Sequence, residues 1–146
     1  ILKAKQRGDR ELFEQGVLDV KMSKSRPRGA IFIHDSEEEI RVKIRKALCP
    51  PREVELNPIL ELARYIVFRD RKEPLEIVNA KTGERMVFDN YSELERAYAE
   101  GRLHPLDLKN AVAGELSRIL EPARKHFLEG PGRTYLEEMK EIRITR

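Results

Sequence analysis

Apolar residues recur every three or four positions in several stretches of the chain, and this spacing predicts amphipathic helices. The first predicted helix lies in the stretch HDSEEEIRVKIRKALCPP. Ser36 and Glu39 have the spacing of a capping box, and acidic residues fill the first turn, where the helix dipole favours them. Pro50 and Pro51 end the helix, because proline lacks the backbone N–H that a helix interior needs. The expected buried stripe consists of Ile40, Ile44 and Ala47.

Three further stretches show the same helical period. In NPILELARYIVF, Asn57 is the expected cap and Pro58 the first helical residue. The helix in YSELERAYAEG is expected to stop at Gly101. LHPLDLKNAVAGELSRILEPARKHF is the longest periodic stretch, begins at Pro105, and is expected to kink or break at Pro122. The apolar side of this stretch comprises Leu108, Val112, Leu116, Ile119 and Leu120.

Two alternating, β-branched segments interrupt the helical pattern. Residues 75–79 and 84–88 flank a short turn that contains Gly83, which predicts a β-hairpin. A short apolar strand is also expected at residues 30–33. Residues 1–16 are charged and predict a surface helix or an arm that becomes ordered on contact, and RTYLEEMKEIRI predicts a last amphipathic segment. The pattern therefore indicates a mainly α protein with one small hairpin.

Composition narrows the classes of protein to consider. The 29 basic and 26 acidic residues leave a net charge of only +3, so any nucleic-acid binding must come from local patches. The single cysteine, Cys49, excludes an internal disulfide framework and is expected to be a small buried residue in a reducing, cytoplasmic protein. With only three histidines and one cysteine in the chain, we expect no protein metal site.

No apolar run reaches the ~20 residues of a membrane span, and no signal peptide is recognisable. Because the first residue is Ile1, we expect the chain to be a piece of a longer protein.

The stretch DVKMSKSRPRG gathers four basic side chains around two serines. Lysine ammonium groups are mobile point charges, and they suit phosphates whose bonds are breaking. From charge alone, a solvated basic loop is the alternative interpretation. The basic side chains are those of Lys21, Lys24, Arg26 and Arg28.

The string Lys21-Met22-Ser23-Lys24-Ser25 is identical to the KMSKS signature loop of class I aminoacyl-tRNA synthetases. Residues 17–128 as a whole resemble the carboxy-terminal half of tyrosyl-tRNA synthetases of the archaeal and eukaryotic type, most specifically in HPLDLKN. The resemblance implies that all five loop residues bind ATP, whose Mg²⁺ is carried by the nucleotide. It also implies that Lys21 and Lys24 stabilise the leaving pyrophosphate during tyrosine activation. Many relatives have serine at the fourth position, so Lys24 adds a charge.

The second signature of class I synthetases, His-x-Gly-His, is absent from this chain. The resemblance therefore implies a remnant of a Rossmann-type catalytic domain at residues 1–33, followed by a helical anticodon-binding domain at residues 34–146. We expect the chain alone to be inactive, because the tyrosine pocket lies in the missing domain. The whole enzyme would be a homodimeric tyrosine–tRNA ligase, and its RNA partner would be the tyrosine-specific tRNA.

The family resemblance also assigns an anticodon site. Asp107 would accept hydrogen bonds from the two N–H donors on the guanine edge, and His104 would stack on or contact the same nucleotide. Pro105 would fix the entry angle, while Lys81 or Arg85 would contact backbone phosphate. From the residues alone, Asp107 is an acidic residue that complements a helix N-terminus, and that interpretation stays open.

Two other functions remain open on the sequence. One is a free-standing RNA-binding module that descends from a synthetase and has no catalytic activity. The other is the tryptophan enzyme, which has the same architecture, although HPLDLKN argues for tyrosine. The aromatic residues Tyr65, Phe68 and Phe127 are expected in the core rather than on an RNA surface.

Overall fold

The computed structural model describes residues 30–141. The lysine loop and the predicted arm at residues 1–16 lie outside this range. The described elements are, in chain order, α3 (Glu37–Lys46), α4 (Pro58–Leu62), the π-helix η1 (Ala63–Val67), β1 (Leu75–Val78), β2 (Arg85–Phe88), α5 (Tyr91–Ala99), α6 (Pro105–Leu128) and α7 (Arg133–Glu141).

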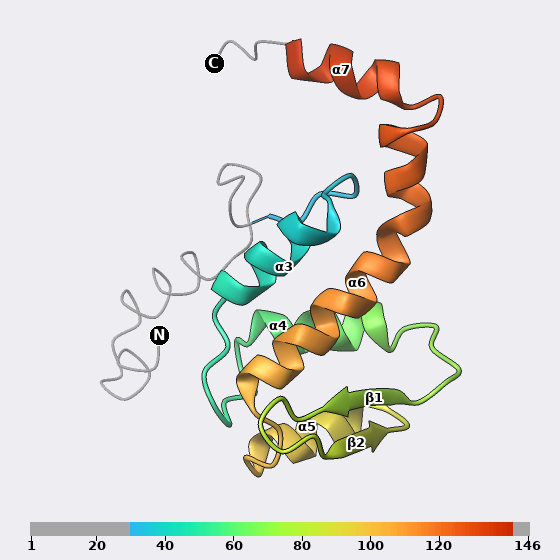
Figure 1. The fold of residues 1–146 in the computed structure, drawn as a ribbon. Coiled ribbons are helices and arrows are strands. Elements are labelled where there is room, and N and C mark those ends of the chain that lie inside the picture. Colours follow the sequence, from blue (N-terminus) through green and yellow to red (C-terminus); the bar gives the residue numbers. More distant parts are fainter. Residues whose placement is uncertain (1–29, 142–146) are drawn as a thin grey trace, which may run out of the picture.

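The long helix α6 is the axis around which the other elements pack (Figure 1). Helices α3 and α4 lie along its sides, the hairpin and α5 lie at its amino-terminal end, and α7 follows its carboxy-terminal end. The prediction of a mainly helical fold with one hairpin is confirmed. The largest fully buried side chains in the centre of the core, apart from Asn57, are Ile40, Ile44, Ile59, Leu60, Leu75, Ile77, Leu94, Tyr98, Leu103, Leu108 and Val112.

Local signals in the sequence fix most helix ends. The Ser36 hydroxyl accepts from the Glu39 N–H at 3.2 Å, and the Glu39 carboxylate accepts from the Ser36 N–H at 2.8 Å, so the predicted capping box forms. The bond from the Ser36 N–H, together with a second one from the Ser36 hydroxyl at 2.8 Å, lowers the pKa of the Glu39 carboxyl. Asn57 caps α4 through the N–H groups of Ile59 and Leu60, as predicted. Gly101 has φ +80° just after α5, a conformation in which glycine has no Cβ penalty.

The hairpin pairs β1 and β2 antiparallel. Leu75 lies opposite Phe88 and Val78 lies opposite Arg85 in its register. Alternation places the inward-facing side chains of Leu75 and Phe88 in the core, whereas Val78 and Val87 are exposed on the outer face. This half-buried arrangement confirms the predicted hairpin.

The prediction of a strand at residues 30–33 is wrong. This segment instead ends in a turn in which the Asp35 N–H donates to the Phe32 carbonyl at 3.1 Å. The Phe32 N–H in turn donates to the Asp35 carboxylate at 2.8 Å. Asp35 thus satisfies both backbone groups of Phe32, the N–H with its side chain and the carbonyl with its own N–H, which a strand would have paired with a neighbour.

The expectation that three aromatic residues lie in the core needs correction for one of them. Tyr65 is 61% exposed rather than buried, because it lies two residues from both Ala63 and Val67 and so on the opposite side of the helix. Phe68 is half-buried and packs against the core, as expected, and Phe127 is half-buried. Of the two effects expected at Pro122, a break does not occur, because α6 continues through this residue to Leu128.

A buried ion pair ties the segment before α3 to the rest of the fold. The Lys43 ammonium donates to the Asp35 carboxylate at 2.6 Å, and their side chains are 13% and 4% exposed. Arg124 of α6 donates to the Asp35 carbonyl at 3.3 Å and to the Ser117 carbonyl at 3.2 Å. These contacts fix the start of the described chain against both α3 and α6.

Candidate nucleic-acid interface

Three of the predicted anticodon residues lie at the amino-terminal end of α6. His104 is the N-cap, and its Nδ1 accepts from the Leu106 N–H at 3.1 Å. Pro105 is the first helical residue, and Asp107 provides the acidic side chain of the first turn. The capping bond fixes the orientation of an exposed imidazole ring, with Nδ1 as the acceptor.

Asp107 is joined to the hairpin turn. Its Oδ1 accepts a hydrogen bond from the Ala80 N–H at 3.1 Å, and the residue is only 5% exposed. The carboxylate therefore has a structural partner in addition to the positive end of the α6 dipole. Each carboxylate oxygen has two lone pairs, so this bond leaves acceptor capacity for a further donor.

The hairpin turn is held by the Asn79 side chain. Its Oδ1 accepts from the N–H groups of Lys81 at 2.9 Å and Thr82 at 3.1 Å, and its carbonyl accepts from Gly83, which has φ +73°. Lys81 itself is exposed, and its ammonium group has no hydrogen bond or ion pair within residues 30–141. The turn thus presents a cation available to a ligand beside the start of α6.

Arg85 lies further along the hairpin and has a partner. Its guanidinium forms a 3.1 Å ion pair with Glu76, and the two side chains are 71% and 48% exposed. The register makes this a diagonal cross-strand pair on the outer face of the hairpin. Solvent screening makes such an exposed pair weak, so Arg85 can exchange Glu76 for a phosphate at low cost.

The loop between α3 and α4 is anchored from α5. The Tyr98 hydroxyl donates to the Pro50 carbonyl at 2.7 Å and lies 3.2 Å from Cys49 Sγ. Burial and the contact with Cys49 raise the pKa of the Tyr98 hydroxyl. The prediction that Cys49 is a small buried residue is confirmed. Arg52 and Leu56 have positive φ values of 62° and 56°, so this anchored loop contains backbone strain.

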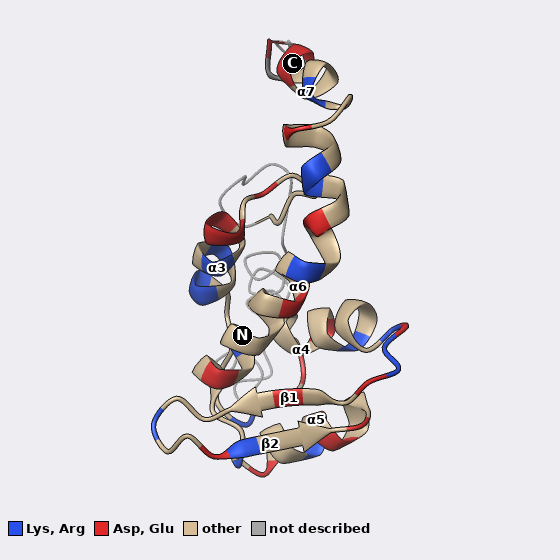
Figure 2. Cartoon of the chain, turned by 45° about the vertical axis from the view of Figure 1, so that its right-hand side comes forward, with Lys and Arg blue, Asp and Glu red and all other residues tan. Residues whose placement is uncertain are grey.

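Basic residues also gather away from the hairpin. Figure 2 shows Lys and Arg on the carboxy-terminal half of α3, where the sequence has Lys43, Arg45 and Lys46. Between residues 30 and 141, no group of His, Cys, Asp or Glu side chains could hold a metal ion. Within the same range, none of the helices has the length and apolar character that crossing a membrane requires.

Comparison with known proteins gives the family. The model of class I tRNA synthetases for tryptophan and tyrosine matches residues 14–121, and the chain belongs to this family. Its similar relatives are tyrosine–tRNA ligases: that of Pyrobaculum arsenaticum is 56% identical over 88% of this chain, and that of Pyrococcus furiosus is 52% identical over 93%. The chain spans about a third of their length, namely 35% and 36%.

Solved structures agree with this assignment. The crystal structure of tyrosyl-tRNA synthetase from Pyrococcus horikoshii, complexed with L-tyrosine, superposes with a TM-score of 0.76 at 50% identity. The match covers 84% of this chain and 33% of that protein. The synthetase from Aeropyrum pernix gives a TM-score of 0.75 at 46% identity over 84% of this chain and 35% of that one. The predicted resemblance to the carboxy-terminal part of the archaeal tyrosine enzyme is thus confirmed.

Proposed function

We propose that this chain is the tRNA-binding part of a cytoplasmic tyrosine–tRNA ligase and that the hairpin turn and the start of α6 bind the anticodon. The observation that supports this most directly is the contact between Asp107 and Ala80. This bond holds the hairpin turn, which carries Lys81, against the first turn of α6, which carries Asp107 and follows the exposed His104.

The chemistry suits an unpaired guanine. Its Watson–Crick edge has two adjacent N–H donors, and the carboxylate of Asp107 offers matching acceptors. Asp107 is only 5% exposed, so a base can reach its carboxylate only if part of the surrounding chain moves aside. We expect the exposed turn at Lys81 and Thr82 to be the segment that moves. His104, fixed by its capping bond, provides a face for stacking.

The catalytic half of the proposal concerns Lys21, Lys24 and their neighbours in the signature loop. These residues bind ATP, with Mg²⁺ carried by the nucleotide, and stabilise the pyrophosphate that leaves during tyrosine activation. Tyrosine binding is expected to need the Rossmann-type domain of the whole enzyme. Homodimerisation of the whole enzyme is expected to involve that domain as well.

Binding of two RNAs to the purified 146-residue chain tests the anticodon assignment. The first is the tyrosine-specific tRNA with guanine as the first anticodon base, and the second differs from it only at that base. We expect both to bind with a salt-dependent phosphate contribution, and the guanine RNA to bind more tightly by roughly 1–3 kcal/mol. Equal affinities at every salt concentration would exclude base recognition by this surface.

A further inference from the structure

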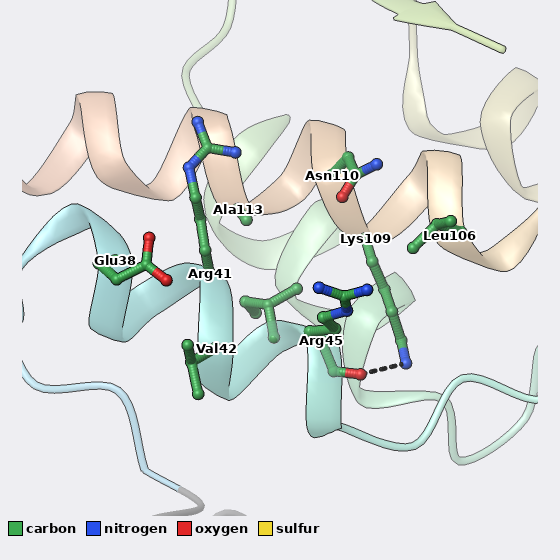
Figure 3. A pocket seen from close by; sticks show the side chains of 9 residues that line it. Glu38, Arg41, Val42, Arg45, Leu106, Lys109, Asn110 and Ala113 are labelled. Carbon is green, nitrogen blue, oxygen red and sulfur yellow. Dashed lines mark hydrogen bonds between the residues drawn. The ribbon is translucent and has the colours of Figure 1, made fainter. Parts of the chain in front are cut away.

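A groove lies between α3 and α6, on a different side of α6 from the hairpin. Its volume is about 360 Å³. Arg41 and Arg45 line it from α3, while Leu106, Lys109 and Asn110 line it from α6 (Figure 3). The floor includes Ala113 and the buried Ile44. The groove therefore combines an apolar floor with a basic rim.

The basic rim has unused hydrogen-bonding capacity. Arg41 and Arg45 are four residues apart, so they lie on one face of α3, separated by roughly 6 Å along the helix. Arg41 donates to Glu37 at 2.7 and 3.0 Å through Nη2 and Nε, whereas the guanidinium of Arg45 has no partner within the described range. Lys109 uses one ammonium donor on the Arg45 carbonyl at 3.0 Å and keeps two more.

Each cation of the basic rim also has a local structural role. Cations in the last turn of α3 complement its dipole, which accounts for Arg45. Arg41 pairs with Glu37, and Lys109 donates to the Arg45 carbonyl in the last turn of α3, but both side chains keep unused donors in the groove that they line together with Arg45. Among the described residues that line the groove, Glu38 alone carries a carboxylate. The site is therefore suited to an anionic ligand, and arginine forks match phosphate oxygens in particular.

We infer that this groove binds backbone phosphates of the same RNA strand whose base is recognised at Asp107. This inference rests on the proposed function. Leu106 lines the groove and is the neighbour in sequence of Asp107, so the two sites flank the first turn of α6. An RNA strand that leaves the base site over this turn reaches the cations of the groove, and the separation of Arg41 and Arg45 allows each to contact a different phosphate.

The test is a binding comparison on the full 146-residue chain. The RNA probe is the anticodon stem-loop of the tyrosine tRNA, prepared with either guanine or another base at the first anticodon position. The variant Arg41→Gln/Arg45→Gln removes two exposed charges from the groove. Its matched control is Arg69→Gln/Lys72→Gln, which removes two exposed charges from the loop after η1, outside the groove.

We expect the groove variant to bind both RNAs about tenfold or more weakly, the equivalent of at least one charge-assisted hydrogen bond. The slope of its salt dependence should flatten by roughly 0.7–0.9 for each phosphate that the variant no longer binds, while the control pair changes little. Neutral methylphosphonate substitutions, scanned through the probe, should identify positions that weaken wild-type binding but leave the groove variant unaffected. Such non-additivity identifies a direct contact.

Two of the possible outcomes separate the groove inference from the anticodon assignment. Equal decreases in affinity for the groove and control variants, with guanine preference intact, would overturn the groove inference alone. A decrease only in the groove variant, without any guanine preference, would support the groove while rejecting the base site. Absence of RNA binding to the wild-type chain would overturn both.

Discussion

Asp107 on α6 and Ala80 in the hairpin turn are joined by a 3.1 Å hydrogen bond, in which the carboxylate accepts from the backbone N–H. The residue proposed to recognise guanine is thus also the residue that fastens the turn to the helix. Removing its side chain would change both the base site and the position of Lys81. A test of its function must therefore separate these two effects.

Asp107→Asn makes that separation. The amide oxygen can still accept from Ala80, but its NH₂ group faces the donors of guanine instead of accepting from them. We expect the Asp107→Asn variant to have a lower affinity for the guanine RNA by roughly 1–3 kcal/mol and a nearly constant affinity for the changed RNA. Equilibrium binding of both RNAs at one ionic strength measures this difference.

Asp107→Ala is the comparison variant. It removes the acceptor for Ala80 altogether, so it should also lower the free energy of unfolding by about 1.5–3 kcal/mol, the range for a hydrogen bond to a charged group. Denaturant unfolding would show this decrease in the alanine variant and a much smaller one in the asparagine variant. If Asp107→Asn weakens both RNAs equally, Asp107 acts only on the turn and the helix end.

The buried pair of Asp35 and Lys43 supplies a stability prediction. Lys43→Ala leaves the Asp35 carboxylate, 4% exposed, without its cation, and this should lower the free energy of unfolding by about 3–5 kcal/mol. Arg41→Ala, which breaks the exposed pair with Glu37, should cost at most about 1 kcal/mol. Denaturant unfolding of both variants compares them, and similar small decreases would mean that the buried pair is not a structural anchor.

Sequence patterns predict the local features of this fold because their causes are local. The capping residues Ser36 and Asn57 and the stop at Gly101 need only neighbours within a few positions, and all three predictions are confirmed. Tyr65 shows the opposite case. Its aromatic character suggests burial, but the period set by Ala63 and Val67 turns it outward, so the helical pattern is the better guide.

Contacts between distant residues cannot be predicted in this way. The bond between Asp107 and Ala80 spans 27 positions, and no local spacing or period links the two stretches; only the family resemblance assigns Asp107 and Lys81 to one site. The groove depends on the packing of α3 against α6, which are far apart in sequence, so Arg41 and Lys109 give no joint signal. The i,i+4 spacing of Arg41 and Arg45 is visible in the sequence, but their common groove requires the fold.

Glu39 makes the stability of α3 dependent on pH. Its hydrogen bonds to Ser36 lower its pKa in the folded state below the ordinary value of 4.5, so the unfolded chain binds the proton more readily. Its contribution is therefore present above about pH 4.5 and is lost as the pH falls through the folded-state pKa. Glu39→Gln should flatten the acid loss of stability, whereas Glu38→Gln, outside the capping box, should leave it unchanged. Denaturant unfolding across this pH range would detect the difference, and parallel curves for wild type and Glu39→Gln would contradict it.

The signature loop gives the last prediction, which concerns catalysis. Lys21 and Lys24 are proposed to act on the pyrophosphate as it leaves, so their ammonium groups should contribute more to the transition state than to the binding of tyrosine. In a whole enzyme that joins this chain to a Rossmann-type domain, Lys21→Ala or Lys24→Ala should slow tyrosine activation by a factor equivalent to about 2–4 kcal/mol, by comparison with the removal of oxyanion donors. The dissociation constant for tyrosine should change little.

Tyrosine-dependent exchange of pyrophosphate into ATP measures the rate, and the 146-residue chain alone, expected to be inactive, is the negative control. A collapse of tyrosine affinity with an unchanged rate at saturation would show that the loop does not act on the leaving group.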